Sequence, residues 1–212
     1  MEKIIIVGIG GHAKVIIDIL LKLNYNLFGY IDSSDKGTIR DINYLGNDDY
    51  FIKNYMKYST RNLVIGISYP NHDILSPIRK KIIYTYEKQG FHFPSIVSPD
   101  AIINSKIEFG RGVVVMDGAV INSNVKIGDF CVINTNSTIE HDCVLGYNVQ
   151  VGSGAILCGN AKVEHDSFIG AGAIIRDEII IGEDVLVGAG SVVIKDISEK
   201  GVYVGNPARR ID

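Results

Sequence analysis

The hydrophobic residues of the C-terminal half recur with a period of six. Counting in sixes from Val97 to Val193 gives seventeen positions, and sixteen of them are Val, Ile or Leu. A second register, four residues after each of these, holds a small or aliphatic residue at every step from Ala101 to Ile197. The position just after the aliphatic residue is often glycine, as at Gly110, Gly128, Gly146, Gly152, Gly170, Gly182 and Gly188.

A six-residue period fits neither an α-helix nor a simple alternating strand. It is typical of a coil in which every side is one short strand followed by a corner, with the aliphatic residue pointing inward and glycine easing the bend. Three sides make a coil of 18 residues, so residues 18 apart should stack. About five to six stacked coils would bury one continuous aliphatic column. We therefore expect an all-β parallel β-helix with a short C-terminal tail over residues 93–212.

The first part of the chain, residues 1–92, carries a different pattern. Short buried strands are expected at Lys3–Val7, Leu27–Ile31 and Leu63–Ile67. Helical apolar periodicity covers Ala13–Leu23, and a second helix capped by Asn71 or Asp73 should reach about Lys88. Strands alternating with helices predict an α/β domain, a Rossmann-like βαβ half-unit that binds a nucleotide.

A glycine-rich turn, Gly8-Ile9-Gly10-Gly11-His12, separates the first strand from the first helix. Its spacing up to Ala13, with Asp32 about 20 residues on, matches the dinucleotide fingerprint and raises the alternative of an NAD-dependent enzyme. These residues supply too few strands for a whole dinucleotide site, and amides at a helix N-terminus bind any phosphate. We therefore favour a sugar nucleotide at this turn. His12 either bonds locally or donates to the sugar or phosphate.

Composition narrows the possible partners and compartments. A formal charge of −3 and a pI near 5.9 show no basic excess, which argues against nucleic acid as a partner. The longest apolar stretch, residues 15–23, is interrupted by Asp18 and Lys22, so no membrane-spanning helix is expected. No cleavable signal peptide follows Met1, and Cys131, Cys143 and Cys158 lack paired spacing. Reduced thiols in the cytoplasm are therefore expected.

Two identical triplets in the β-helix carry the candidate chemistry, Glu140-His141-Asp142 and Glu164-His165-Asp166. Transfer of an acyl group to an amine or hydroxyl needs a base, and a nearby carboxylate raises the basicity of an imidazole and orients it. Both triplets supply these groups, so composition alone does not choose between them.

Stacking favours His141 over His165. Eighteen residues above His141 is Gly159, which leaves room over the imidazole and exposes a backbone N–H for a developing oxyanion. His165 instead stacks between Tyr147 and Glu183, a crowded setting without an obvious donor. We therefore interpret His165 as a solvated side chain, and we expect the two histidines on different faces.

Other chemistries are disfavoured. Consecutive residues of a strand point to opposite faces, so neither triplet can converge on one metal ion. A serine nucleophile lacks the nucleophile elbow. Cys131 and Cys143 occupy the small inward register, where a core role is favoured over a catalytic thiol. The assignment of Cys158 is left open.

The chain resembles the bacterial sugar acetyltransferases of the NeuD/PglD/VioB type over nearly its whole length. The resemblance rests on Val7–His12, on Ile133-Asn134-Thr135 leading to Ile139–Cys143, on Gly170–Ala173, and on the tail Gly201–Arg209. It implies a left-handed coil, a homotrimer, and acetyl-CoA lying between neighbouring β-helices.

The resemblance also assigns roles to residues. It implies His141 as the general base, Asp142 or Glu140 as the group that raises its basicity, and the Gly159 amide as the donor to the thioester carbonyl. It places the sugar nucleotide against Gly10, Gly11, His12, Asp32, Ser33, Gly66 and Asn134, and CoA along Gln150, Ala171 and Arg209. Where many members carry a second histidine that contacts CoA, this chain has Gln150.

The activity expected from this resemblance is acetyl-CoA-dependent N-acetylation, without a metal. The acceptor would be the 4-amino group of a UDP-, GDP- or dTDP-linked 4-amino-4,6-dideoxyhexose, in bacterial surface glycan biosynthesis. One alternative is O-acetylation of sialic acid or a related sugar, and another is a non-catalytic β-helix scaffold. A zinc protein like carbonic anhydrase would need three histidines at a trimer interface, whereas the register offers two per chain on different faces.

Overall fold

A computed structural model describes residues 2–68 and 78–212. The chain forms two compact units, Met1–Pro94 and Ser95–Asp212, so the division falls two residues after the boundary expected from the sequence. The expected helix cap at Asn71 or Asp73 lies outside the described residues. No helix among the described residues is long and apolar enough to cross a membrane.

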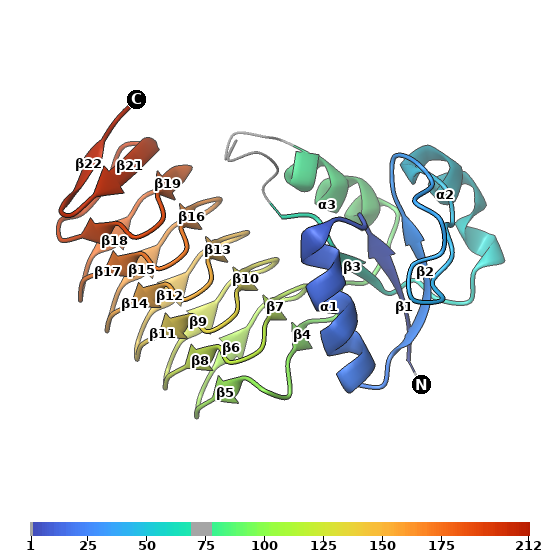
Figure 1. The fold of residues 1–212 in the computed structure, drawn as a ribbon, viewed down its shortest axis with the longest axis horizontal. Coiled ribbons are helices and arrows are strands. Elements are labelled where there is room, and N and C mark those ends of the chain that lie inside the picture. Colours follow the sequence, from blue (N-terminus) through green and yellow to red (C-terminus); the bar gives the residue numbers. More distant parts are fainter. Residues whose placement is uncertain (1, 69–77) are drawn as a thin grey trace. The chain divides into compact units, whose positions relative to one another are not determined.

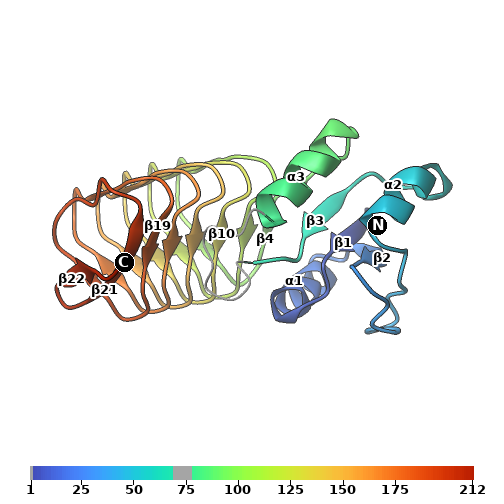
Figure 2. The same ribbon diagram turned by 90° about the horizontal axis from the view of Figure 1, so that it is seen from above.

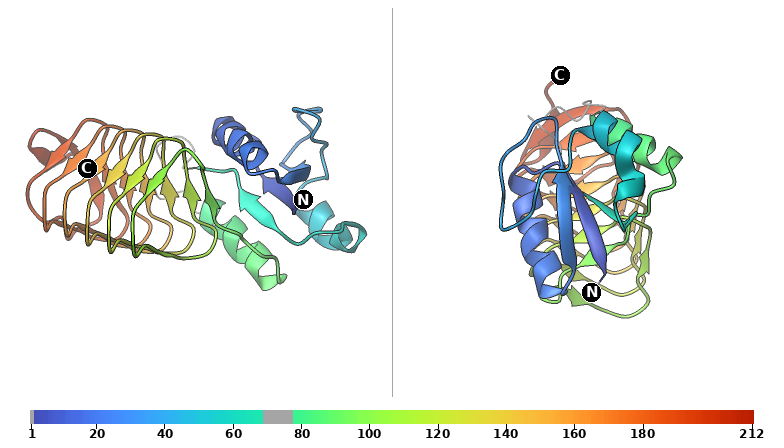
Figure 3. Two further views of the ribbon diagram at one scale, coloured as in Figure 1. Left: turned by 90° about the horizontal axis from the view of Figure 1, so that it is seen from below. Right: turned by 90° about the vertical axis from the view of Figure 1, so that its right-hand side faces the viewer.

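The N-terminal unit is built on a three-stranded parallel sheet. Its strands are β1 (Lys3–Val7), β2 (Asn26–Ile31) and β3 (Leu63–Ile65), in the order β2-β1-β3. Helix α1 (Gly11–Lys22) lies on one side of this sheet, and α2 (Asp48–Asn54) and α3 (Ile78–Lys88) lie on the other (Figures 1 and 3). A short 3-10 turn, η1 (Tyr55–Lys57), follows α2.

Three features of this unit differ from the expectation. Strand β3 ends at Ile65 rather than Ile67. Helix α1 begins at Gly11 rather than Ala13, because Gly10 is already its N-cap residue in an extended conformation. Helix α2 was not anticipated. Its cap is the Asn47 side chain, which accepts a hydrogen bond from the Tyr50 N–H at 2.9 Å. Phe51 of α2 stacks on Tyr58 at a ring-centroid distance of 5.2 Å, which buries the apolar side of this short helix.

The C-terminal unit is a parallel β-helix with three faces, seen side-on in Figure 2. The first face contains β4 (Ile96–Val97), β7 (Val114–Val115), β10 (Val132–Ile133), β13 (Gln150–Val151), β16 (Phe168–Ile169) and β19 (Val185–Val187). The second contains β5 (Ile102–Ile103), β8 (Val120–Ile121), β11 (Thr138–Ile139), β14 (Ile156–Leu157), β17 (Ile174–Ile175) and β20 (Val192–Val193). The third contains β6 (Glu108–Phe109), β9 (Lys126–Ile127), β12 (Val144–Leu145), β15 (Lys162–Val163) and β18 (Ile180–Ile181).

Register and core agree with the six-residue period. Paired residues on each face are 18 apart, as in Val132 with Gln150 and Thr138 with Ile156. The aliphatic and small registers together form one buried column, which includes Cys131 and Cys143. Beyond the last coil, β21 (Gly201–Gly205) pairs with β19 and turns back into β22 (Ala208–Arg210).

The corners between faces have a common backbone conformation. The third residue after the inward aliphatic adopts a positive φ, for example 63° at Asn124 and 62° at Asp142. Asn, Asp and Gly tolerate this left-handed conformation better than other residues. The repeated conformation places residues 18 apart directly above one another at each corner, where their side chains form hydrogen-bonded ladders.

Candidate active site

The His141 corner, which joins β11 to β12, consists of Glu140, His141 and Asp142. Oδ2 of Asp142 lies 2.8 Å from Nδ1 of His141. An ionised carboxylate can only accept hydrogen bonds, so Nδ1 must be the donor in this contact. In the neutral imidazole Nδ1 therefore carries the proton and Nε2 keeps its lone pair. The corner therefore presents an imidazole that can accept a proton at Nε2.

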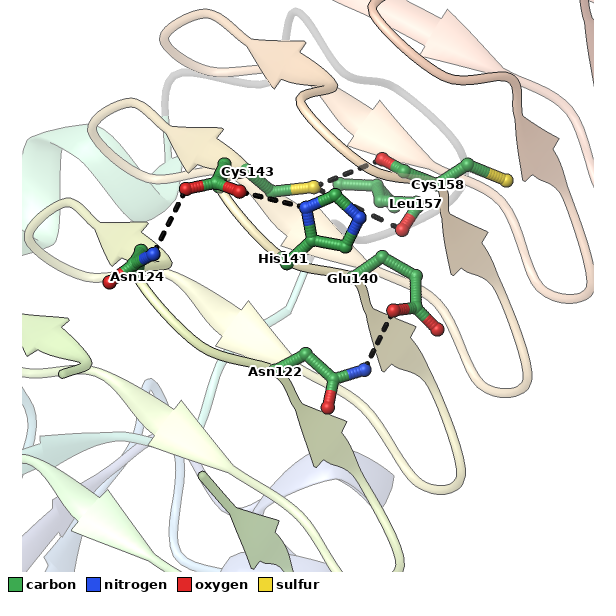
Figure 4. A network of polar contacts seen from close by, with 8 residues as sticks. Asn122, Asn124, Glu140, His141, Cys143, Leu157 and Cys158 are labelled. Carbon is green, nitrogen blue, oxygen red and sulfur yellow. Dashed lines mark hydrogen bonds and ion pairs between the residues drawn. The ribbon is translucent and has the colours of Figure 1, made fainter. Parts of the chain in front are cut away.

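Two amides from the coil below hold the carboxylates of this corner. Nδ2 of Asn124 donates to Oδ1 of Asp142 at 3.1 Å, and Nδ2 of Asn122 donates to Oε2 of Glu140 at 2.7 Å (Figure 4). The hydrogen bond from His141, followed by the one from Asn124, lowers the pKa of Asp142, which keeps it ionised. It is thus Asp142, rather than Glu140, that contacts the imidazole in the structure.

Gly159 lies above His141, where the stacking argument placed it. A Cβ at Gly159 would sit 2.8 Å from both Cε1 and Nε2 of His141, so only glycine leaves the ring where it is. Asn160 fixes the coil above by donating its N–H to the His141 carbonyl at 2.9 Å. Within the described residues the Gly159 N–H makes no hydrogen bond. A free donor and a free acceptor thus lie at the same corner.

The thiols near this corner have no catalytic geometry. Cys143 points into the core and donates from Sγ to the Cys158 carbonyl at 3.1 Å (Figure 4). Burial raises the pKa of Cys143 to about 12, so it stays a thiol. Cys158 is half-buried, and burial together with the charges of Asp177 and Glu140 raises its pKa.

The His165 corner, which joins β15 to β16, differs from the His141 corner. The ring is exposed, but its Nδ1 accepts a hydrogen bond from the backbone N–H of Tyr147, one coil below, at 2.7 Å. Oδ1 of Asp166 accepts from Nδ2 of Asn148 at 2.9 Å. The side chain that we interpreted as solvated is thus exposed, and its ring also accepts a hydrogen bond from the Tyr147 backbone that the sequence did not reveal. With Nδ1 accepting, the neutral ring carries its proton on Nε2 and cannot act as a base there.

A second candidate site is a cavity of about 540 Å³ in the N-terminal unit. Six residues expected at the nucleotide line it together: Gly10, Gly11, His12, Asp32, Ser33 and Gly66. A Cβ at Gly10 or Gly11 would meet no atom within 4 Å, so the backbone of this turn is open to a ligand. Oδ2 of Asp32 accepts from the Ile9 N–H at 3.1 Å and so orders the turn from below.

His12 is the unusual group in this cavity. Desolvation, followed by the nearby charge of Arg79, lowers the pKa of His12 to about 3, so the ring is neutral at physiological pH. Its Nε2 is buried and has no hydrogen-bond partner within the described part of the chain. Arg79 is itself buried and donates to the Ile67 carbonyl. Buried polar atoms are normally paired, so this nitrogen distinguishes His12 from the other residues that line the cavity.

The remaining predicted residues lie away from the His141 corner of the same chain. Asn134 and Ala171 belong to the corner between the first and second faces. Gln150 is fully buried in β13, and Arg209 is exposed in β22. No group of three or more His, Cys, Asp and Glu side chains in residues 2–68 and 78–212 is placed to hold a metal ion.

Sequence reasoning missed Asn122, Asn124 and Arg79. The two asparagines could have been found, because subtracting 18 from Glu140 and Asp142 gives their positions. Arg79 carried no comparable signal, since an arginine in a helix is usually exposed.

Comparisons with known proteins match both units. Residues 3–83 match the PglD N-terminal domain, and residues 160–195 match the bacterial transferase hexapeptide (six repeats). PerB from Caulobacter crescentus, solved with CoA and GDP-perosamine, is 29% identical with a TM-score of 0.90, covering 100% of this chain and 98% of that one. The acetyltransferase domain of PglB from Neisseria gonorrhoeae, solved with acetyl coenzyme A, is 29% identical with a TM-score of 0.88 and 99% coverage of both chains. WeeI from Acinetobacter baumannii is 28% identical, with a TM-score of 0.86 and full coverage.

Together, the fold and the matches define a hexapeptide-repeat acetyltransferase with a left-handed parallel β-helix. The N-terminal match narrows the class, because a PglD N-terminal domain precedes the β-helix and the whole chain is similar to sugar acetyltransferases such as PerB, as the resemblance to the NeuD/PglD/VioB type predicted. The resemblance seen in the sequence is thereby confirmed, and the CoA bound in two of these structures agrees with the expected cosubstrate.

Proposed function

We propose that this chain transfers the acetyl group of acetyl-CoA to the 4-amino group of a nucleotide-linked 4-amino-4,6-dideoxyhexose, in bacterial surface glycan biosynthesis. The observation that carries the proposal is the 2.8 Å contact between Asp142 Oδ2 and His141 Nδ1, which leaves Nε2 free beside Gly159. The bound GDP-perosamine in PerB supports an amino sugar as acceptor. A perosamine N-acetyltransferase from Caulobacter crescentus was also solved as a histidine-to-asparagine variant with CoA and GDP-perosamine.

The chemistry follows from the corner. The neutral amine attacks the thioester carbonyl while Nε2 of His141 takes its proton. Asp142 stabilises the imidazolium that forms, and the Gly159 N–H donates to the oxyanion of the tetrahedral intermediate. Collapse of the intermediate breaks the carbon–sulfur bond, and His141 returns the proton to the leaving thiolate. The products are the acetamido sugar and free CoA.

The acceptor nucleotide is proposed to bind in the cavity of the N-terminal unit. The open backbone at Gly10 and Gly11, at the N-terminus of α1, suits a phosphate, and His12 offers an unpaired neutral nitrogen. Free sialic acid, the alternative acceptor for O-acetylation, carries no nucleotide phosphate for this turn. The cavity therefore favours the nucleotide-linked amino sugar over the O-acetylation alternative.

A homotrimer with CoA between neighbouring β-helices completes the proposal. Outward-facing Ile102 and Ile174 on the second face, and Val144 and Ile180 on the third, are exposed in the single chain, and a closed symmetric assembly would cover them. The corner near Ala171 is open, since a Cβ at neighbouring Gly172 would meet nothing within 4 Å, which suits an extended cosubstrate. Gln150, buried in the single chain, gives this part of the proposal no support. Sedimentation equilibrium should show a trimer, and a stable, active monomer would contradict an interfacial site.

The activity is tested by following release of the CoA thiol with a panel of UDP-, GDP- and dTDP-linked amino sugars and with sialic acid. We expect turnover with one class of nucleotide amino sugar. Turnover with sialic acid alone would support the O-acetylation alternative, and thiol release with none of them would favour a scaffold.

The division of labour between the units is tested with Gly10→Val. The new side chain fits the folded turn but blocks close approach of a phosphate. We expect a strong rise in the acceptor's KM with little change in the dissociation constant for CoA, measured calorimetrically. Loss of CoA binding with normal sugar binding would invert the assignment. Tight binding of NADH to the unsubstituted chain would restore the dinucleotide alternative.

A further inference from the structure

Asn124 lies one coil below Asp142 at the same corner position. Both residues adopt the left-handed backbone conformation, so their side chains leave the corner in parallel. The amide of Asn124 donates a hydrogen bond to Oδ1 of Asp142 at 3.1 Å. The imidazole of His141 donates from Nδ1 to Oδ2 of the same carboxylate at 2.8 Å. One carboxylate oxygen of Asp142 thus accepts from Asn124 and the other from the candidate base His141.

We infer that Asn124 is a positioning residue for the acetyl transfer, holding the Asp142 carboxylate in the plane that orients His141. The inference rests on the proposed function. The Asp142 side chain is 43% exposed, and the terminal torsion of an aspartate has a broad energy well, so one contact does not fix the carboxylate. A second donor, the Asn124 amide on the opposite oxygen, fixes the orientation of the carboxylate. The oriented carboxylate in turn fixes the tautomer and the ring plane of His141.

A second ladder of hydrogen bonds runs beside the Asn124–Asp142 pair, and it ends on a different carboxylate. Asn104 donates to Asn122 at 2.7 Å, and Asn122 donates to Glu140 at 2.7 Å. This second chain of amides ends on the carboxylate that does not contact the imidazole. The two ladders therefore assign the two carboxylates of the triplet to different tasks.

The competing interpretation is that an Asn–Asp ladder only stabilises a corner. Asn148 and Asp166 form the same contact, at 2.9 Å, at the His165 corner, where the imidazole does not contact the carboxylate. Asn148 also has a positive φ, of 55°. The pair Asn148–Asp166 is thus a control in which the ladder is present and the proposed positioning role is absent, with the difference that Asn148 is fully buried and Asn124 is exposed.

The decisive variant is Asn124→Gly, because glycine keeps the left-handed corner while removing the amide. We expect kcat in the thiol-release assay to fall about 2- to 13-fold, as for one ordinary hydrogen bond at an exposed carboxylate, with KM changed by less than about twofold. Asn148→Gly should lower the melting temperature and leave kcat near the unsubstituted value, measured well below that temperature.

A second variant, Asn124→Asp, tests whether position 124 lies close enough to Asp142 and His141 to act on the base. A second carboxylate beside Asp142 adds negative charge near the imidazole and favours its protonated form, so the acidic limb of the kcat/KM profile should shift to higher pH. If Asn124→Gly and Asn148→Gly both leave kcat unchanged, and the profile of Asn124→Asp does not move, Asn124 is only structural. Full activity in His141→Ala would instead overturn the proposed function, so the two failures are distinguishable.

Discussion

The two Glu-His-Asp corners share their sequence and differ in their chemistry. At one corner the ring of His141 lies against Gly159 of the coil above, and at the other the ring of His165 lies against Gly146 and Tyr147 of the coil below. Each triplet contains a base, two carboxylates and a left-handed aspartate. What separates them is therefore the residues 18 positions away, which decide the direction in which the ring leans.

The consequence appears at Nδ1. A carboxylate accepts from Nδ1 of His141 and leaves Nε2 unprotonated, whereas a backbone N–H donates to Nδ1 of His165 and places the proton on Nε2. A neutral imidazole can take a proton only at its unprotonated nitrogen. In a repeating fold, a catalytic motif therefore has to be considered together with the coils above and below it.

The sharpest way to break this comparison is to remove each ring in turn. His141→Ala should lower kcat by about 10²- to 10⁴-fold, the usual contribution of a general base. His165→Ala should stay within about twofold, because its Nε2 cannot accept a proton while Nδ1 is occupied. Steady-state thiol release measures both variants. The reverse result would show that the tautomer argument has chosen the wrong corner.

The glycines against which the rings lie give a second, smaller contrast. In Gly159→Ala, the new methyl group would lie 2.8 Å from Nε2 of His141, so the ring must move and kcat should fall about 10- to 100-fold. The atoms it meets belong to a side chain that can rotate, so stability should change little. In Gly146→Ala, the methyl group would also lie 2.9 Å from the backbone N of His165. This variant should lose stability and keep its kcat.

Thermal melts recorded beside the kinetic assays separate these two outcomes. A large loss of melting temperature in Gly159→Ala, with kcat preserved, would mean that this glycine serves the packing of the coils rather than the room over the base.

Substituting the aspartates of the two corners, Asp142 and Asp166, tests the comparison further. Asp142→Asn keeps an oxygen for the Nδ1–H of His141 but removes the charge that stabilises the imidazolium, and kcat should fall about tenfold. Asp166→Asn should have no comparable effect, because Asp166 contacts Asn148 and not the ring. Equal losses in the two variants would indicate that these aspartates matter as corner residues only.

The parts of the fold that a repeated sequence pattern specifies were predictable, and the parts that a single residue specifies were not. Sixteen of the seventeen hexad positions hold Val, Ile or Leu, so the three-sided β-helix follows from the pattern, although its left hand was implied only by the resemblance. Helix α2 has only seven residues, too few to show a helical period, and its single signal is the capping Asn47. Such a short element depends on tertiary packing, here the burial of Phe51, which no local pattern reveals.

The candidate site was predictable where stacking alone decides it. Constant register places Gly159 over His141, because the strands below and above pair without a shift. Register does not state which way a side chain leans, so the hydrogen bond from Tyr147 to His165 could not be derived. The burial of Gln150 is a similar case, since the alternation of its two-residue strand places it on the outer surface.

His12 differs from His141 and His165 in that burial, rather than a hydrogen-bond partner, chiefly sets its protonation state. Its substitution should have the smallest effect of those considered. His12 lines the nucleotide cavity, and its buried Nε2 has no hydrogen-bond partner among the residues that the structure describes. His12→Ala should weaken the sugar nucleotide by about 0.5–1.5 kcal/mol, one neutral hydrogen bond, and leave the dissociation constant for CoA unchanged. Calorimetric titration measures both constants, and His92→Ala provides a control histidine outside the cavity lining.

The same burial gives a test in stability. The pKa of His12 falls from 6.5 to about 3 on folding, chiefly by desolvation and further by the charge of Arg79. Between these two pH values the unfolded chain binds a proton on His12 that the folded chain does not bind. The free energy of unfolding should therefore decline as the pH falls from about 6.5 toward about 3. His12→Gln removes that titration, so its free energy of unfolding, followed by urea denaturation between pH 7 and pH 4, should decline less steeply than that of the unsubstituted chain. Parallel declines would mean that His12 takes up its proton in the folded state, and the unpaired Nε2 would then be a cationic rather than a neutral contact for the nucleotide.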